Sequence, residues 1–240
     1  ELQDSYKSIL ESLVHAGAAN KVKVNVVSVH SEHLEEQSIG QLFENFDGIV
    51  VAPGFGSRGI EGKIKAVNFA RTHSLPYFGI CLGMQMAVIE YARNVLNLKK
   101  ANTVEVDEHT PDPVIHLMET QKEVAQKGGT MRLGSWKCTI KPETLLSKAY
   151  RGQNQINERH RHRFELNNAY KQALEDVGMI ASGINPETGL VEAIEIPEHP
   201  WFVGVQFHPE YKSTVENPHP LFVSFVEAAN KYHNAKSAKA

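Results

Sequence analysis

The stretch Pro76-Tyr-Phe-Gly-Ile-Cys-Leu-Gly-Met-Gln85 joins a short apolar run to a helical pattern. The apolar run 77–80 predicts a buried strand, and the spacing of the apolar residues after Cys81 predicts a helix that begins at once. Gly79 and Gly83 stand two residues from Cys81 on either side. Because a turn this tight leaves little room for a Cβ atom, glycine suits both positions. The sequence therefore predicts that Cys81 lies at a sharp turn from a strand into a helix.

This position makes Cys81 a candidate nucleophile. A strand-to-helix turn is the geometry of the nucleophile elbow, here with sulfur in place of oxygen. The N-terminus of a helix presents unpaired N–H groups and a partial positive charge, and both favour the reactive thiolate. A lone cysteine after an apolar run is also compatible with a buried structural residue that precedes an ordinary helix. The rest of the chain has to decide between these alternatives.

The composition narrows the classes of function. The chain has 240 residues, a net charge of −3 and no long run of one sign, which argues against a nucleic-acid surface or a polybasic membrane patch. Its two cysteines, Cys81 and Cys138, are too few for a disulfide framework, and we expect a reduced, cytoplasmic setting. The 12 histidines form no H-E-x-x-H motif and no zinc-type pairing with cysteine, so we expect no metal site.

Strand and helix patterns alternate through the first part of the chain. We expect strands at 21–30, 48–52 and 77–80 and helices at 2–15, 60–73 and 82–97. This alternation predicts an α/β fold, with a doubly wound, mostly parallel sheet and helices on both faces. Ligands of such sheets bind beyond the carboxyl ends of the strands, where Cys81 and the Gly-rich loop 53–59 would both lie.

The second part of the chain is less regular. The polar segment 119–129 predicts an exposed loop, and three strands separated by turn signals are expected between 179 and 207. We see no domain boundary, so residues 1–233 are predicted to form one domain. The tail 234–240 has nothing to bury and is expected to fray.

His208-Pro-Glu210 follows the last of these expected strands. In an extended segment, residues two apart point the same way, so the imidazole and the carboxylate would lie together. A neutral imidazole can take the proton of the Cys81 thiol while a carboxylate holds its other ring nitrogen. A surface His-Pro-Glu turn is the plainer alternative for this motif by itself.

Gly79-Ile-Cys-Leu-Gly-Met-Gln85 and His208-Pro-Glu210 together resemble the class I glutamine amidotransferases, a family with a Cys-His-Glu triad. Further motifs narrow the resemblance to the C-terminal glutaminase domains of the CTP synthases. These motifs are Phe55–Lys63, Gly129–Gly134, Glu158–Glu165 and His199–Phe202. Because they are spread along nearly the whole chain, the resemblance implies the amidotransferase fold for the entire domain.

The resemblance also implies a reaction. Cys81 would attack the side-chain amide carbon of L-glutamine and release ammonia, and water would then hydrolyse the thioester to glutamate. His208 would act first as base and then as acid, and Glu210 would orient it. The backbone N–H groups of Gly54 and Leu82 would bind the oxyanion of the tetrahedral intermediate.

The resemblance assigns further residues to L-glutamine binding, namely Gly83, Met84, Gln85, Glu105 and Arg163. A carboxylate suits the substrate α-ammonium group and a guanidinium suits its α-carboxylate. By themselves, Glu105 and Arg163 would be taken for ordinary surface residues.

The loop after Pro53 resembles a lid that is linked to activation by GTP. The effector residues would be Phe55, Arg58, Gly59 and Glu61. The loop is not a Walker A sequence, and an ordinary strand-to-helix loop is the alternative. Pro53 stands where the family usually has glycine and has no N–H to donate, but Gly54 keeps its own.

The resemblance implies partners outside this sequence. No cofactor is expected in this domain, whereas the intact enzyme would use ATP and Mg²⁺ in a synthetase domain that aminates UTP to CTP. That synthetase domain and the first strand expected before Glu1 are absent from this sequence. The intact enzyme is expected to be a homotetramer, and this chain alone a monomer or weak dimer.

Other readings remain for the chain as a whole. Another class I amidotransferase or a γ-glutamyl hydrolase would share the triad, although the run 158–165 and Arg58 argue against both. A non-catalytic binding or assembly module would keep only the fold. The presence of Cys81, His208 and Glu210 together argues against that module.

Overall fold

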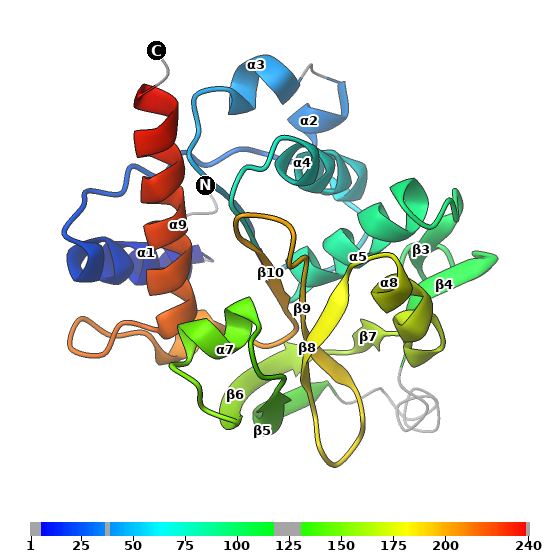
Figure 1. The fold of residues 1–240 in the computed structure, drawn as a ribbon. Helices are drawn as coiled ribbons and strands as arrows, with labels where there is room; N and C mark the ends of the chain where they lie inside the picture. The colour runs from blue at the N-terminus through cyan, green and yellow to red at the C-terminus, as the bar shows by residue number, and fades with distance from the viewer. Residues whose placement is uncertain (1–5, 37–38, 118–130, 239–240) are drawn as a thin grey trace.

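The computed structural model describes residues 6–36, 39–117 and 131–238, and these form helices and strands in an α/β order (Figure 1). The helices are α1 (Lys7–Asn20), α2 (His33–Glu36), α3 (Ile39–Phe43), α4 (Ile60–Thr72), α5 (Leu82–Asn94), α7 (Leu145–Ala149), α8 (Lys171–Asp176) and α9 (Pro220–Ser237). The strands are β1 (Ile49–Val51), β2 (Tyr77–Ile80), β3 (Ala101–Thr103), β4 (Asp112–Leu117), β5 (Arg132–Ile140), β6 (Gln155–His162), β7 (Phe164–Leu166), β8 (Ile180–Ile184), β9 (Val191–Glu195) and β10 (Phe202–Val205). Short 3-10 turns are η2 (Asn168–Tyr170) and η3 (Pro209–Lys212).

The main sheet has the strand order β1-β2-β10-β9-β8-β5-β6. The α/β prediction is confirmed, but parallel pairing is limited to β1 with β2 and β2 with β10. The pairs from β10 through β9, β8 and β5 to β6 are antiparallel, so the sheet is mixed rather than mostly parallel. The reason lies in the connections. Parallel neighbours need a crossover such as α4, whereas short loops without a helix join β8 to β9 and β9 to β10.

Helices cover both faces of the parallel part of the sheet (Figure 1). Successive residues of β2 point to opposite faces, and the two large side chains Tyr77 and Phe78 are both fully buried. Tyr77 belongs to the core formed with α4 and α5, whereas Phe78 packs in the core formed with α1 and α9. The rings of Phe78 and Phe222 meet edge to face at 5.2 Å. This two-sided packing holds β2, and therefore Cys81 at its end, in one position.

A smaller sheet lies beside α5 and has the order β3-β4-β7 (Figure 1). Strand β3 pairs parallel to β4, and β4 pairs antiparallel to β7. The chain leaves β3 just before Glu105, and β7 begins at Phe164 directly after Arg163. The small sheet therefore brings Glu105 and the distant pair Arg163 and Phe164 to the side of α5.

The strand predicted at 21–30 is wrong for the described residues. This segment has no ladder hydrogen bonds, and the side chains of Val26 and Val27 are 46% and 61% exposed. Its alternating valines do turn Val22 and Val24 toward the core. Alternating valines indicate which side of an extended segment is buried, but a β-strand also needs a neighbouring strand with which it can form hydrogen bonds.

The prediction that the tail 234–240 frays is also wrong for residues 234–237, because α9 continues to Ser237. Lys236 donates to the carbonyl oxygen of Glu44, and His233 pairs with Asp47 at 3.1 Å, which gives the last turns contacts of their own. The predicted loop 119–129 lies outside the described residues. Among the residues that are described, no helix has the length and apolar character needed to cross a membrane.

Candidate active site

Cys81 lies at the junction of β2 and α5, as predicted, with its side chain almost completely buried. Its backbone adopts φ +52° and ψ −102°, a strained region that a non-glycine residue holds only where the surroundings impose it. Its N–H donates to the Val205 carbonyl oxygen at 2.7 Å, which ties the turn to β10. Backbone strain at a buried cysteine on a helix N-terminus is a signature of a functional position.

The flanking glycines are required by close backbone contacts. A Cβ atom on Gly83 would lie 2.2 Å from the Val51 carbonyl oxygen, and one on Gly79 would lie 2.7 Å from the Gly83 carbonyl carbon. Neither neighbour is a flexible side chain, so neither contact can be relieved cheaply. Glycine at both positions therefore allows α5 to start against the ends of β1 and β2.

His208 and Glu210 are paired, but not through an extended segment as predicted. Pro209 begins the 3-10 turn η3, and this turn brings His208 Nδ1 to 2.7 Å from Glu210 Oε1. The His208 ring also stacks on Tyr211 with centroids 5.1 Å apart. Because Nδ1 faces a carboxylate, it carries the ring proton and leaves a lone pair on Nε2. Nε2 has no hydrogen-bond partner among the described residues, so it is available to accept a proton.

Burial opposes the effect of helix polarity on the Cys81 thiol. Burial raises its pKa, and the carboxylate of Glu210 raises it further. A hydrogen bond from the Leu82 backbone acts in the opposite direction but is outweighed. The helix N-terminus therefore does not by itself produce the thiolate, and a base must remove the proton.

A narrow cavity opens beside the Cys81 side chain. Its lining residues are Gly54, Phe55, Cys81, Gln85, Glu105, His162, Arg163 and Phe164. Several residues that the sequence predicted to bind substrate thus meet around the candidate nucleophile. Leu82, Gly83 and Met84 lie beneath them in the buried first turn of α5. A Cβ atom on Gly54 would touch the Leu82 side chain at 3.2 Å, so these two candidate oxyanion residues are neighbours.

The cavity residues also hold one another. Glu105 Oε1 accepts the backbone N–H of Gly56 at 2.9 Å, which fastens the Gly-rich loop to the small sheet. Gln85 Nε2 donates to the Phe164 carbonyl oxygen at 3.0 Å and to Gln206 Oε1 at 3.2 Å. Both protons of the Gln85 amide are therefore used, and only its Oε1 remains for a substrate.

A second cavity of about 210 Å³ lies on the other side of Gly54. It is lined by Tyr6, Ser8, Ile9, Pro53, Gly54, Phe55, Arg161, His208, Glu210 and Tyr211. The Pro53 carbonyl oxygen accepts the Tyr6 hydroxyl at 3.4 Å. Cys81 thus lines the first cavity and His208 and Glu210 line the second, and the two cavities share Gly54 and Phe55.

The structure separates the predicted effector residues. Phe55 is 51% exposed and lines both cavities. Arg58 instead pairs with Glu32 at 3.5 Å on the surface, and Glu61 accepts from Arg93 at 2.9 Å. Gly59 starts α4 with φ +67°, where a Cβ atom would collide with Ser31. None of Arg58, Gly59 and Glu61 lines either cavity, and their link to an effector stays a prediction.

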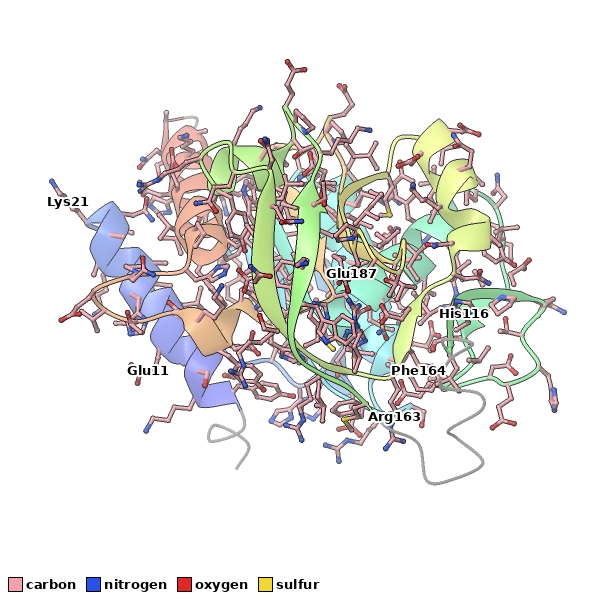
Figure 2. The ribbon with its side chains drawn as sticks, turned by 90° about the horizontal axis from the view of Figure 1, so that it is seen from below. Glu11, Lys21, His116, Arg163, Phe164 and Glu187 are labelled. Carbon is pink, nitrogen blue, oxygen red and sulfur yellow. The ribbon has the colours of Figure 1, made fainter. Side chains whose placement is uncertain are left out.

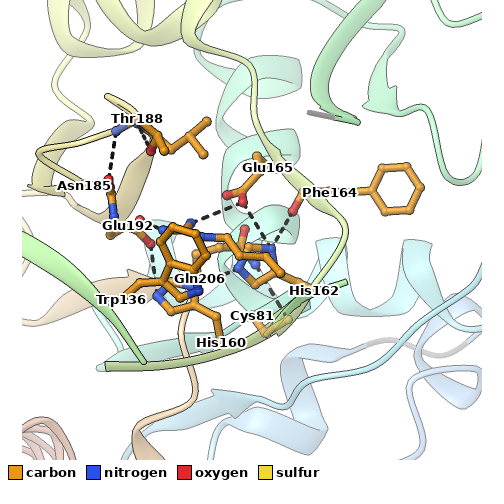
Figure 3. Close-up of polar contacts among 12 residues, drawn as sticks. Cys81, Trp136, His160, His162, Phe164, Glu165, Asn185, Thr188, Glu192 and Gln206 are labelled. Atoms are coloured by element: carbon orange, nitrogen blue, oxygen red, sulfur yellow. Dashed lines mark hydrogen bonds and ion pairs between the residues drawn. The ribbon is translucent and has the colours of Figure 1, made fainter. Parts of the chain in front are cut away.

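Sequence reasoning missed a buried ionic cluster behind the cavity, formed by Arg132, His160, His162, Glu165 and Glu192 (Figure 3). The signal was present in β6, where exposed arginines alternate with the buried residues Glu158, His160 and His162. A period of two in an extended strand predicts that every second side chain of this run turns inward. In Figure 2, Arg163 and Phe164 lie where this strand ends, beside the small sheet.

One arginine serves two carboxylates in this ionic cluster. Arg132 donates to Glu192 Oε1 at 2.6 Å and to Glu165 Oε1 at 3.3 Å. Burial raises the pKa of Glu165 to about 8 and that of Glu192 to about 7, even beside the guanidinium. Burial also lowers the pKa of His162 to about 3 and lowers that of His160, so both rings are neutral.

The hydrogen bonds locate the protons of these rings. His162 Nδ1 lies 3.2 Å from the Phe164 carbonyl oxygen, which can only accept, so Nδ1 carries the proton. His162 Nε2 is then an acceptor for His160 Nδ1 at 2.8 Å. This leaves a lone pair on His160 Nε2, which faces Glu192 Oε2 at 3.4 Å. Two lone pairs would repel there, so a proton on Glu192 best satisfies both atoms, in agreement with its raised pKa.

A separate set of contacts anchors the turn that carries Glu210. The buried carboxylate of Glu158 accepts from Tyr150 at 3.0 Å and from Lys212 at 3.1 Å. Lys212 belongs to η3, so β6 holds this turn as well as the ionic cluster. Among the described residues, no group of three or more His, Cys, Asp or Glu side chains is arranged to hold a metal ion.

The comparisons with known proteins agree with this geometry. The family model of class-I glutamine amidotransferases matches residues 1–228. The chain is 62% identical over 243 residues to a CTP synthase of Christiangramia forsetii and 60% identical over 233 residues to one of Flavobacterium johnsoniae. It covers 44% and 43% of the length of these two relatives, and they cover 100% and 97% of this chain.

A solved structure matches the fold over almost the whole domain. It is the glutaminase domain of Trypanosoma brucei CTPS with bound acivicin, with a TM-score of 0.91 and 37% identity. The match covers 96% of this chain and 90% of that one. The chain therefore belongs to the class-I glutamine amidotransferase family, as a glutaminase domain of the CTP synthase type.

Proposed function

We propose that this chain hydrolyses L-glutamine to glutamate and ammonia through a thioester on Cys81. The observation that carries the proposal is the strained, buried Cys81 at the start of α5, beside a cavity and near the His208–Glu210 pair. The solved relative of Trypanosoma brucei has acivicin bound, and we infer that the cavity beside Cys81 in this chain takes glutamine or a glutamine-like inhibitor.

The first half of the reaction forms the thioester. His208 Nε2 takes the Cys81 proton as the sulfur attacks the side-chain amide carbon of glutamine. The negative charge that develops on the amide oxygen is met by the backbone N–H groups of Gly54 and Leu82, each worth roughly 3–4 kcal/mol in comparable sites. The C–N bond then breaks, and the imidazolium of His208 protonates the departing nitrogen to give ammonia. Glu210 stabilises that imidazolium and keeps its Nε2 directed at the reacting atoms.

The second half returns the enzyme to its starting state. His208 Nε2 takes a proton from water, and the oxygen attacks the thioester carbon. The C–S bond breaks with its electron pair on sulfur, and His208 returns the proton to Cys81. The products are glutamate and the free thiol, so atoms and protons balance over the cycle.

Three cavity residues suit the rest of the substrate. The carboxylate of Glu105 would bind the α-ammonium group, and the guanidinium of Arg163 would bind the α-carboxylate. Gln85 would contribute only its Oε1, because its amide protons are already bonded. Acid, amide and guanidinium around one cavity favour an amino acid over a purely anionic substrate.

The intact protein would use the ammonia elsewhere. We extend the proposal to a cytoplasmic ligase of pyrimidine biosynthesis in which a synthetase domain uses ATP and Mg²⁺ to convert UTP to CTP. The support is the identity to CTP synthases about twice the length of this chain. Association into homotetramers would belong to that whole protein, with this chain alone a monomer or weak dimer.

A labelling experiment tests the proposed glutaminase. Acivicin is incubated with the chain, with Cys81→Ala and with Cys138→Ala, and the intact mass is recorded. We expect one adduct on the wild type and on Cys138→Ala, suppressed by excess glutamine, and none on Cys81→Ala. Glutamate release should follow the same pattern. A wild type with neither adduct nor glutamate release, even with GTP added, would favour the non-catalytic binding module.

Activation by GTP is a separate part of the proposal. Phe55 at the mouth of both cavities would contact the effector, and the segment with Arg58, Gly59 and Glu61 would close as a lid. GTP dependence of glutamine hydrolysis is compared between wild type and Arg58→Ala, with Lys65→Ala on the exposed face of α4 as control. If Arg58→Ala keeps the full activation, Arg58 has no part in the lid.

A further inference from the structure

Gln206 is a completely buried polar residue beside the nucleophile, and the triad mechanism does not use it. Strands β2 and β10 are parallel neighbours, with Ile80 opposite Val205. The next residues, Cys81 and Gln206, therefore leave the sheet at the same level and side by side. Gln206 Nε2 lies 3.6 Å from Cys81 Sγ, within hydrogen-bond distance for sulfur (Figure 3).

The surrounding bonds determine which end of the Gln206 amide faces the sulfur. The Phe164 carbonyl can only accept, so Gln85 must turn its NH₂ toward it. The same NH₂ lies 3.2 Å from Gln206, which must therefore present its oxygen there. The Gln206 NH₂ is left pointing at Cys81 Sγ. A flipped amide would set two donors against each other at Gln85, so the network permits one orientation.

The backbone of Gln206 is held equally firmly. Its N–H donates to the Glu192 carbonyl oxygen at 2.8 Å, and Glu192 is a member of the buried ionic cluster. On the other side, His162 of the same cluster donates to the Phe164 carbonyl oxygen, and His160 donates in turn to His162. The donor that faces the sulfur is thus preorganised by bonds on both of its sides.

The groups around Cys81 disfavour its thiolate, and the Gln206 N–H would counteract them. The acidic groups that act on the thiol are Glu210, Glu165 and Glu105, and each raises the pKa of Cys81 when it is ionised. His208 can offset them only after it has taken the proton. Apart from the Leu82 backbone, the Gln206 amide is the donor that the described residues direct at the sulfur. A hydrogen bond to an ionised acceptor is roughly twice as strong as one to a neutral acceptor, so this contact strengthens as the thiolate forms.

We propose that Gln206 is a catalytic residue whose side-chain amide donates an N–H to Cys81 Sγ and stabilises the thiolate. The inference rests on the proposed thioester mechanism. Gln206 would act twice in that cycle. Its N–H would stabilise the sulfur when His208 removes the thiol proton before attack, and again when the C–S bond breaks and the electron pair returns to sulfur. No bond to Gln206 forms or breaks, and its amide stays neutral throughout.

The test compares two substitutions that differ in shape and charge. Gln206→Met keeps the length of the side chain but has no N–H donor. Gln206→Glu keeps the oxygen that accepts from Gln85, and it puts a second carboxyl oxygen in place of the NH₂ group that faces the sulfur. Asn185→Asp is the matched control, because Asn185 is another fully buried amide, bonded to the Lys137 carbonyl at 2.9 Å. Thermal unfolding and circular dichroism establish that each variant is folded.

Two rates are measured for each folded variant. The first is alkylation of Cys81 by iodoacetamide between pH 7 and 9.5, followed on the Cys81 peptide by mass spectrometry so that Cys138 does not interfere. The second is glutamate release at saturating glutamine. We expect Gln206→Met to lower both about tenfold, the smaller end of what a hydrogen bond to a charged group contributes, with KM within twofold of wild type. Gln206→Glu should lower both further, and its deficit should grow as its carboxyl ionises.

The outcomes separate this inference from the function on which it rests. If Gln206→Met or Gln206→Glu is folded and alkylates at the wild-type rate within twofold, the sulfur contact has no chemical effect and the proposal fails. A fall in glutamate release through KM alone, with normal alkylation, would show a merely structural role. If the wild type releases no glutamate, the proposed function fails, while the alkylation rates still decide whether Gln206 stabilises the thiolate.

Discussion

Replacement of Arg132 by methionine is the sharpest stability test of the buried ionic cluster. The Arg132 side chain is 2% exposed and donates to Glu192 at 2.6 Å and Glu165 at 3.3 Å. Methionine keeps most of the apolar stem but removes the cation. It leaves two buried carboxyl groups without the one guanidinium that serves both.

The loss in free energy of unfolding caused by Arg132→Met depends on pH because the two carboxyl groups titrate. Removing one partner of a buried ion pair costs about 3–5 kcal/mol, since the remaining charge is uncompensated. We expect this loss for Arg132→Met at pH 8.5, where the wild type has both carboxyl groups largely ionised beside the guanidinium, with pKa values of about 8 for Glu165 and about 7 for Glu192. At pH 5.5 both groups are protonated in the folded protein, and neutral acids do not need the cation. The loss should then shrink to the contact of the guanidinium with the Trp136 ring, about 0.5–1 kcal/mol.

The assay is urea unfolding followed by circular dichroism at both pH values. Lys137→Met is the control on the same strand, because its pair with Glu187 is 3.2 Å long but exposed, and we expect a loss of less than about 1 kcal/mol at either pH. Adding Glu192→Gln to Arg132→Met should restore part of the loss at pH 8.5. A loss of under about 1 kcal/mol at pH 8.5, or the same loss at both pH values, would refute the electrostatic account.

Other perturbations test separate parts of the structure. Gly83→Ala should lower the free energy of unfolding by about 1–3 kcal/mol and reduce Cys81 labelling, because its Cβ atom would lie 2.2 Å from a backbone carbonyl of β1. Gly40→Ala in α3, where a Cβ atom meets nothing within 4 Å, should be neutral or stabilising by chemical denaturation, and an equal loss in both variants would contradict the steric argument. Burial raises the pKa of Glu165 to about 8, so the folded protein binds this proton more tightly than the unfolded chain. Stability should therefore fall as pH rises from about 7 to 8, where the histidines of the unfolded chain, with a pKa of about 6.5, are mostly neutral, and Glu165→Gln should flatten the curve; an unchanged slope would count against it. Glu210→Gln removes the charge that faces His208 at 2.7 Å and should slow glutamate release by a factor on the order of 10³–10⁴, as in serine triads. A fall of less than tenfold would exclude Glu210 from the triad.

Local patterns predicted much of the candidate site because the relevant physics is local. The glycines beside Cys81 are demanded by backbone contacts within a few residues or with the adjoining strand. His208 and Glu210 are close in sequence, so either an extended segment or the observed 3-10 turn can bring them together. Glu105 and Arg163 were different. Nothing near them in sequence marks them, and only the resemblance to a family suggested that they share a cavity with Cys81.

The sequence by itself determined the α/β alternation, the strand-to-helix turn at Cys81 and the identity of the candidate catalytic groups. Periodicity, the steric limits at glycine and side-chain chemistry depend on residues that are close together in the sequence, so the sequence alone is enough to predict them. Only the tertiary structure decided the mixed sheet, the raised pKa of the Cys81 thiol, and the contact of Gln206 with its sulfur. These depend on which distant segments become neighbours and on how much water they exclude. Burial changes the pKa of a thiol or carboxyl and the worth of a hydrogen bond, and burial is a property of the folded chain.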